Sequence, residues 1–374
     1  MIVRKKKAPP AVYSVQTARR TEPVSALGNF VPLRPGERGL YAALREAVPV
    51  IDAALDKIVR LVGGFRVECA PEAQKKFSDF LSNVPVNATQ AGVQPFLDGY
   101  LSQLLTYGNA VGEMVVRNGE FAALYNASLD DVELRTNGPL EIVVRRREAG
   151  GSVPVRYPEL VLCTALNPPP GSAAGVSVLH GLPFVSGILL RIFDAVGKNW
   201  ERMGNVRFAV TYKPGSDEED RAYAAERARQ IASEWGRAMR GGNVSDFVCV
   251  GDVDIRAIGA DNQILDSEIP VRQMLEQIVA KLGVPPFLLG LSWSSTERMS
   301  SQQADILTSE LEAYRRLLNP VLSRICSLWL RLNGYPAGFE IIWDDVTLQD
   351  ASELAAARCK NAQAAQIEQK LGKG

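Results

Sequence analysis

The sequence predicts an α+β fold built in more than one part, and three observations lead to that prediction. Helical and strand-like patterns alternate along most of the 374 residues. Residues 206–258 read as a strand, a helix and a strand in close succession. Two helical patterns, at 178–203 and 267–282, bracket that insert. With 46% hydrophobic residues, a chain of this length can bury substantial cores, and we expect two or three domains.

The composition argues against several classes of protein. Lys and Arg together number 42, as do Asp and Glu, so the bulk charge does not indicate a protein that clamps nucleic acid. The five cysteines are odd in number and contain no C-x-x-C pair, which favours neither a disulfide framework nor a zinc site. No segment reads as a secretory leader or a membrane span. We therefore expect no cofactor, no metal and no membrane association.

The first 175 residues predict a basic arm followed by a mixed helix-and-sheet region. Residues 1–38 are basic and rich in proline, which fits either a solvated tail or a partner-binding arm. Apolar spacing predicts a helix over 40–62, bent near Pro49, and another over 95–107. Asn118-Gly119 predicts a hairpin turn between strands, and further strand patterns continue to about residue 170.

The segment 178–203 predicts a long amphipathic helix. Its apolar row, three or four residues apart, consists of Leu182, Val185, Leu189, Ile192, Val196 and Trp200. Arg191, Lys198 and Arg202 share another face, interleaved with acidic residues. An ordinary solvated helix face is the simpler explanation of this charge pattern, and a ligand-facing one is the alternative.

The rest of the chain contains further helical and strand patterns. Ser216 and Glu219 form a capping box that predicts a helix over 216–240 between two strands. A second amphipathic helix is predicted over 267–282, and a long one over 300–332 with a kink at Pro320. The apolar row of the long helix consists of Leu307, Leu311, Leu318, Leu322, Ile325 and Trp329. A strand near 338–346 and an alanine-rich helix follow.

A search for catalytic chemistry finds little. The one histidine, His180, stands at the entrance of a helix without an obvious partner. The acidic pairs Asp130-Asp131 and Asp344-Asp345 suggest a metal-dependent nuclease only weakly, because neighbouring residues on a strand point to opposite faces. The run "GSAAG" at 171–175 is too short for a phosphate cradle and is expected to be a flexible joint. We expect no enzyme.

The stretch "LGVPPFLLGLSWSSTERMSSQQAD" at 282–305 separates two helical patterns. Gly283 ends the first helix, and two prolines fix the direction of exit. No nucleophile, base or ligand set lies nearby in the sequence. The stretch is expected to be a joint, and a plain helix-to-helix connector is the alternative.

The order of four segments resembles the portal proteins of tailed bacteriophages. These segments are "LLTYGNAVGEMVV" at 104–116, "GVSVLHGL" from 175, "AKLGVPPFLLG" at 280–290 and "STERMSSQQADILTSELEAYRRLLNPVLSRI" at 295–325. Each pattern is weak alone, and their order and spacing carry the resemblance, which spans about residues 40–355.

The resemblance implies a division of the chain into portal parts. They are an N-terminal basic arm at 1–38, a wing at 39–175 and 284–347, stem helices at 176–204 and 263–283, a clip at 205–262 and a short C-terminal crown helix at 348–374. The second wing segment would hold a tunnel loop at 288–300 and the long kinked helix. The crown is shorter here than the bundle of several helices that the family often has.

The resemblance also implies a function and partners. A ring, usually of twelve copies, would stand at one capsid vertex of a virion assembled in the host cytoplasm, with double-stranded DNA passing through its channel. Its partners would be the terminase, the major capsid protein and head-completion or adaptor proteins. Another capsid-associated adaptor or minor head protein is the alternative, and a nucleic-acid-processing enzyme is a weaker one.

Candidate site residues follow from these parts. The positions expected to face the channel or DNA are Ser294, Ser295, Thr296, Glu297, Arg298, Arg191, Lys198, Arg202 and Lys281. The positions expected to dock partners on the clip are Lys213, Asp252 and Asp254.

Overall fold

The chain divides into two compact units in the computed structural model. It describes residues 35–138, 141–204, 207–213, 218–238, 252–258, 267–291 and 297–346. The first unit comprises residues 1–186 and 275–374, and the second comprises residues 187–274. The second unit is therefore one continuous stretch of sequence that is inserted between the two segments of the first.

The first unit begins with two helices where the sequence predicted one bent helix. α1 spans Pro35–Ala47 and α2 spans Pro49–Val62. Val48 between them has an extended backbone, with φ −123° and ψ 90°. A proline disfavours the helical conformation in the residue before it and offers no backbone N–H, so Pro49 breaks the helix rather than bending it. α2 ends at Gly63, whose φ is +80°.

A second pair of elements joins distant parts of the sequence. β1 (Phe65–Cys69) pairs antiparallel with β10 (Phe339–Trp343), so that Phe65 lies opposite Trp343. α3 (Pro71–Asn83), which the sequence patterns did not reveal, follows β1 directly. Side chains of β1, α3 and the end of α9 form one core. Its buried members are Val67, Ala73, Phe77, Cys326, Trp329 and Leu330.

A three-stranded sheet with the order β3-β2-β7 lies against α4 (Val93–Tyr107). Its strands are β2 (Asn109–Arg117), β3 (Glu120–Asn126) and β7 (Val161–Ala165). The predicted hairpin turn joins β2 to β3, with positive φ at both Asn118 and Gly119 as a type I′ turn requires. The aromatic rings of Phe96 and Tyr100 lie against Gly112, where a Cβ would come within 2.6 Å of Phe96.

A second three-stranded sheet has the order β4-β5-β6. Its strands are β4 (Val132–Thr136), β5 (Ile142–Glu148) and β6 (Gly151–Pro154), and a 3-10 turn, η2 (Pro158–Leu160), leads into β7. Val132, Leu134 and Val144 from this sheet share a buried cluster with Val111 and Val161 from the first. The two sheets therefore share one core.

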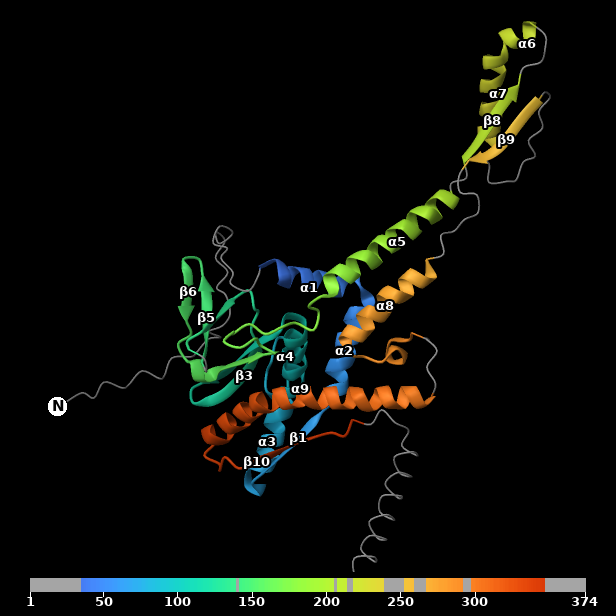
Figure 1. The fold of residues 1–374 in the computed structure, drawn as a ribbon. Coiled ribbons are helices and arrows are strands. Elements are labelled where there is room, and N and C mark those ends of the chain that lie inside the picture. Colours follow the sequence, from blue (N-terminus) through green and yellow to red (C-terminus); the bar gives the residue numbers. More distant parts are fainter. Residues whose placement is uncertain are drawn as a thin grey trace, which may run out of the picture. The chain divides into compact units, whose positions relative to one another are not determined.

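The long helix α9 (Glu297–Leu332) has 36 residues and begins one turn earlier than predicted. Pro320 lies inside it. Figure 1 shows α9 passing close to α2 and to the β1 and β10 pair. Its predicted apolar row is buried in the structure and consists of Leu307, Leu311, Leu318, Leu322, Ile325 and Trp329.

The second unit contains the predicted strand, helix and strand. β8 (Arg207–Lys213) pairs antiparallel with β9 (Asp252–Ile258). The predicted helix over 216–240 is divided into α6 (Glu218–Ala222) and α7 (Ala224–Ala238), and α7 packs on β8. Ser216 of the predicted capping box lies outside the described residues.

Two helices cross the division between the units. They are α5 (Leu182–Gly204) and α8 (Glu268–Leu282), which correspond to the predicted helices at 178–203 and 267–282. Among the described helices, none is both long enough and apolar enough to cross a membrane. The C-terminal helix predicted after residue 350 lies outside the described residues.

Candidate functional site

The charged face predicted on the first long helix is present on α5. Arg191, Asp194 and Lys198 are all exposed, at the spacing of three and four that brings residues to one face of a helix. The Lys198 Nζ donates a 2.6 Å hydrogen bond to Asp194, and the two side chains are 63% and 62% exposed. The acid therefore offsets one of the cations on this face. The backbone of Arg202 belongs to α5, and its side chain lies outside the described residues.

The other predicted cation, Lys281, is exposed in the last turn of α8. A cation at this end of a helix interacts favourably with the helix dipole. Gly283 follows with φ +68°, a conformation that ends helices and suits glycine. Val284 and Pro285 are then buried, and the 3-10 turn η3 (Pro286–Leu289) ends at Gly290, which has φ +72°.

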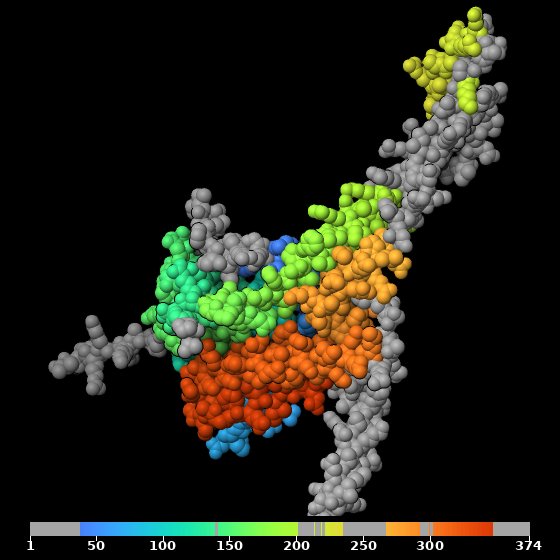
Figure 2. All heavy atoms as spheres, in the orientation of Figure 1, coloured from blue at the N-terminus to red at the C-terminus, as the bar shows by residue number. Residues whose placement is uncertain are grey.

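The chain from Gly283 to Pro286 packs beside a small groove in the first unit. The groove has a volume of about 300 Å³. Figure 2 shows the end of α8 adjoining the surface of α9 in this region, where the groove lies. Its lining residues are Glu276, Val279, Ala280, Gly283, Val284, Pro285, Pro286, Gln303 and Ile306. The chain thus leaves α8 through a turn in which Val284 and Pro285 are buried.

The predicted loop at 288–300 is only partly described. Ser294, Ser295 and Thr296 lie outside the described residues. Glu297 and Arg298 form the first residues of α9, so they are helical in backbone rather than part of a loop. Their side chains lie outside the part of the chain that the structure describes.

A buried arginine that the sequence analysis missed fixes α9 in the first unit. The Arg315 guanidinium donates from Nε and Nη2 to the carbonyl oxygen of Val62, at 2.9 and 2.7 Å. Nη2 also donates to the carbonyl of Asp344 at 2.6 Å, and Nη1 to the Glu312 carboxylate at 2.7 Å. The guanidinium carbon of Arg315, Cζ, lies 5.3 Å from the centre of the Trp343 ring. This one side chain joins α9, the end of α2 and the end of β10.

The sequence does contain a signal for this arginine. Arg315 lies four residues after Leu311 and three before Leu318, so it occupies a core-facing position in the apolar row of α9. An arginine at such a position must find several acceptors, because burying an unpaired charge is costly. The position of Arg315 in the apolar row thus predicts that its guanidinium has hydrogen-bond acceptors, but it does not identify them.

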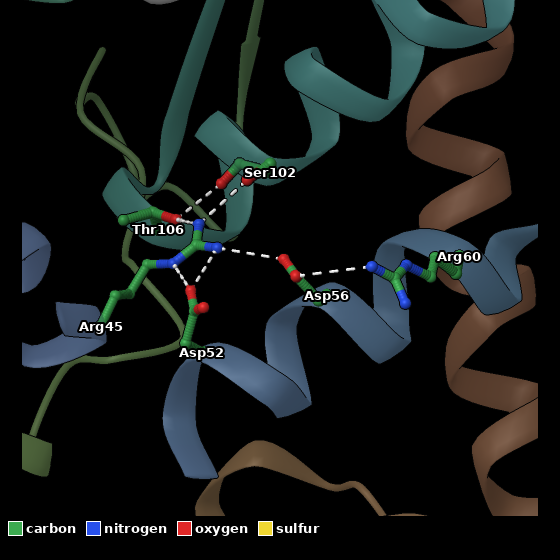
Figure 3. Close-up of polar contacts among 6 residues, drawn as sticks. All are labelled: Arg45, Asp52, Asp56, Arg60, Ser102 and Thr106. Carbon is green, nitrogen blue, oxygen red and sulfur yellow. Dashed lines mark hydrogen bonds and ion pairs between the residues drawn. The ribbon is translucent and has the colours of Figure 1, made fainter. Parts of the chain in front are cut away.

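A second polar network ties α1, α2 and α4 together (Figure 3). Arg45 Nε donates to Asp52 at 2.7 Å, and Nη2 donates to Asp56 at 3.2 Å. Arg45 Nη1 donates to the hydroxyls of Ser102 and Thr106, at 3.0 and 2.9 Å. A cavity of about 470 Å³ adjoins this network. Because every nitrogen of the guanidinium already has an acceptor, the network serves to hold the three helices.

The run 171–175, expected to be a flexible joint, is instead firmly anchored. Buried Asn109 donates from Nδ2 to the Ala173 carbonyl at 3.0 Å and accepts from the Gly175 backbone N–H at 2.9 Å. A Cβ on Gly175 would lie 1.9 Å from the carbonyl oxygen of Gly108. The two glycines allow the backbones to approach closely, so this segment fixes the start of α5 rather than loosening it.

The residues weighed for catalysis are dispersed. His180 is exposed, and its backbone N–H bonds to Ser177. Among the described residues, no group of three potential metal ligands occurs. Burial raises the pKa of the Cys163 and Cys326 thiols to about 12, so both remain protonated at neutral pH. The described residues therefore present neither a metal-ligand cluster nor a thiolate.

The predicted partner-docking residues lie on the paired strands of the second unit. Lys213, the last residue of β8, is exposed and lies opposite Asp252 in the antiparallel register. Asp254 lies opposite Thr211. The side chains of the two aspartates lie outside the described residues.

Comparison with known proteins matches no family model and no curated relative. Solved structures do match. A chain from the neck of an empty gene transfer agent particle, computed with C6 symmetry, aligns with a TM-score of 0.61 and 19% identity over 92% of both chains. A chain from the neck of the native particle, computed with C12 symmetry, aligns with a TM-score of 0.58 over the same shares, at 19% identity. This chain shares the fold of that neck component.

What the structural neighbours establish is the fold. A match to the virion of the native gene transfer agent particle has a TM-score of 0.58 and 18% identity over 89% of both chains. A phage portal protein of the HK97 family from Corynebacterium diphtheriae aligns with a TM-score of only 0.40, at 16% identity, over 85% of this chain and 96% of that one.

Proposed function

We propose that this chain is the subunit of a portal-type ring in the neck of a virion or virus-like particle. The observation that carries the proposal is the fold shared over 92% of both chains with a component of the gene transfer agent neck. That neck was computed with C12 and C6 symmetry, which fits a closed ring of identical copies. In this proposal the ring has twelve copies and stands at one capsid vertex, and the chain is a structural protein without enzyme activity.

The proposal assigns the parts of the chain as the sequence resemblance implies. The wing is 39–175 with 284–347, the stem is 176–204 with 263–283, and the clip is 205–262. The anchored segment before α5 and the packed turn after α8 support a stem that leaves and re-enters the wing at fixed points. The basic arm at 1–38 and the crown at 348–374 complete the assignment.

In this function the channel passes double-stranded DNA without gripping it. Each phosphate that a protein neutralises adds salt-dependent affinity, so a sliding channel needs few unopposed cations. The Asp194 carboxylate beside Lys198 supports such a surface. The positions proposed to face DNA are Arg191, Lys198, Arg202 and Lys281, with Ser294, Ser295, Thr296, Glu297 and Arg298 at the tunnel loop.

The clip is proposed to dock the terminase during packaging and head-completion or adaptor proteins afterwards. The supporting observation is that the exposed Lys213 and its opposite residue Asp252 occupy one end of the β8 and β9 pair. Asp254 lies two residues further along β9. The wing is proposed to contact the major capsid protein, with assembly in the host cytoplasm.

Electron microscopy of the purified chain tests the proposal. We expect rings with an axial hole, whose rotational symmetry is read from class-averaged top views. A chain that stays monomeric under all assembly conditions contradicts the proposal. A ring without an axial hole favours a capsid-associated adaptor or minor head protein instead. Hydrolysis of DNA in the presence of Mg²⁺, abolished by Asp344→Ala, would favour the enzyme alternative.

A further inference from the structure

The helix α5 carries large apolar side chains that remain exposed in the structure. The inner row predicted from sequence is covered: Leu182 and Leu189 are buried, and Val185, Ile192 and Val196 are partly buried. Trp200, predicted to belong to that row, is instead 60% exposed. A helix that is apolar over a wide arc is expected to be buried by more than one neighbour.

The uncovered part of this arc is a continuous strip. Leu190 is 38% exposed and Phe193 is 48% exposed, and with Gly197 and Trp200 they follow one another at intervals of three, four and three residues. Residues at these intervals lie on one face of a helix. We call these four residues the α5 strip. The whole strip belongs to the second unit.

The shape of the α5 strip suits another helix. Intervals of three and four are those at which side chains interdigitate between packed helices. At Gly197 an added Cβ would meet no atom within 4 Å, so the strip has an open notch between the two large rings of Phe193 and Trp200. A small residue between large ones lets a second helix approach closely and accepts a side chain from it.

DNA is a poor candidate for the α5 strip. Proteins bind the phosphate backbone through cations and polar groups, and the cations of this helix whose side chains the structure describes, Arg191 and Lys198, lie on a different face. At 3.6 residues per turn, that face is centred roughly 130° from the strip. The helix therefore has one face suited to a polyanion and another suited to an apolar surface.

We propose that the α5 strip is the contact between neighbouring copies of this chain, and that it receives a helix of the next copy. This inference rests on the proposed function, because the symmetric neck structures place identical copies around an axis. A closed ring brings corresponding helices of adjacent copies side by side, and its heterologous contact joins two different surfaces of each copy. The strip supplies one of those surfaces.

Matched charge substitutions test the inference. Phe193→Asp and Trp200→Asp place a carboxylate in the strip, and Ala195→Asp places one at an exposed position of the same helix outside it. The first two variants should weaken assembly about tenfold or more, since large aromatic residues dominate such contacts. Ala195→Asp should assemble like the wild type. Native mass spectrometry at matched concentrations gives the oligomer sizes, and circular dichroism melting checks that all variants fold.

Cysteine labelling provides a second readout that does not depend on disrupting the ring. In Trp200→Cys the new thiol should react with a maleimide in the protomer and be protected in the assembly, as peptide mass spectrometry would show. In Ala195→Cys the thiol should react in both states. If rings form but both Asp variants assemble normally and Cys at position 200 stays reactive, the strip is not the contact, and the proposed function stands. If the wild type never forms a ring, both proposals fail.

Discussion

The two units of this chain use their side chains in opposite ways. In the first unit, buried Arg315 and Asn109 use their hydrogen bonds to hold separate segments together, Arg315 between α9, α2 and β10 and Asn109 beneath the segment 171–175. In the second unit, α5 presents large apolar side chains to solvent, and its described ion pair is on the surface. Buried polar contacts thus hold the described part of the first unit together, whereas α5 leaves large apolar side chains uncovered in the second.

The largest expected effect concerns close backbone contact in the first unit. Gly175→Ala would put a methyl group 1.9 Å from the Gly108 carbonyl and 2.5 Å from the Leu166 nitrogen, so the backbone would have to move. We expect a loss of about 4 kcal/mol or more in the free energy of unfolding. Urea unfolding followed by circular dichroism measures it.

Gly187, in α5, provides the matched control for the substitution at Gly175. A Cβ on Gly187 would meet nothing within 4 Å, and alanine is the better helix former. Gly187→Ala should therefore leave stability unchanged or raise it by up to about 1 kcal/mol. If Gly175→Ala and Gly187→Ala change the free energy of unfolding by similar amounts, the close approach of Gly108 and Gly175 is not a feature that sets the first unit apart.

A smaller loss is expected on removing the buried cation. Arg315→Met keeps an unbranched side chain but leaves the carbonyl oxygens of Val62 and Asp344 without these donors. The free energy of unfolding should fall by about 3 kcal/mol, within the range for breaking a buried polar network. Arg316→Met, at the exposed neighbouring position, should change it by less than about 0.5 kcal/mol. Equal losses in the two variants would contradict a structural role for Arg315.

The smallest expected effect belongs to the exposed ion pair of the second unit. Lys198→Ala removes the contact with Asp194, for which exposed pairs four residues apart contribute about 0.3–0.5 kcal/mol. Alanine's higher helix propensity offsets part of that loss. Thermal unfolding at low and high salt should show a difference from the wild type only at low salt. A large, salt-independent loss would mean that Lys198 stabilises the helix through packing of its aliphatic stem rather than through the ion pair.

Prediction from the sequence succeeded where periodicity or turn chemistry decides the structure locally. The buried row of α9, the Asn118-Gly119 turn and the pattern of strands and helices in the second unit all belong to this class. The helix α3 was missed, although Ala73, Phe77, Phe80 and Leu81 have the spacing of one helix face and pack in one core. Propensity also cannot tell whether a proline bends a helix or ends it, and Pro49 ends it.

The candidate site was harder to predict because it depends on which surfaces meet. The apolar character of Trp200 was visible, but not that it would remain exposed. Likewise, the glycines and alanines at 171–175 suggested freedom, whereas in the fold the absence of side chains permits close packing around Asn109. Small residues read alone do not distinguish a hinge from a tight contact.

The pairing of β1 with β10 has a consequence for synthesis. Phe65 lies opposite Trp343, and Arg315 must reach back to Val62, so the first unit cannot be completed until nearly the whole described chain has left the ribosome. Residues 187–274 emerge as one continuous stretch and can form their local contacts earlier. During that interval the early helices α1 and α2 lack α9, and the α5 strip is already exposed. Under the proposed contact between copies, premature pairing between nascent chains would then be favoured at the strip.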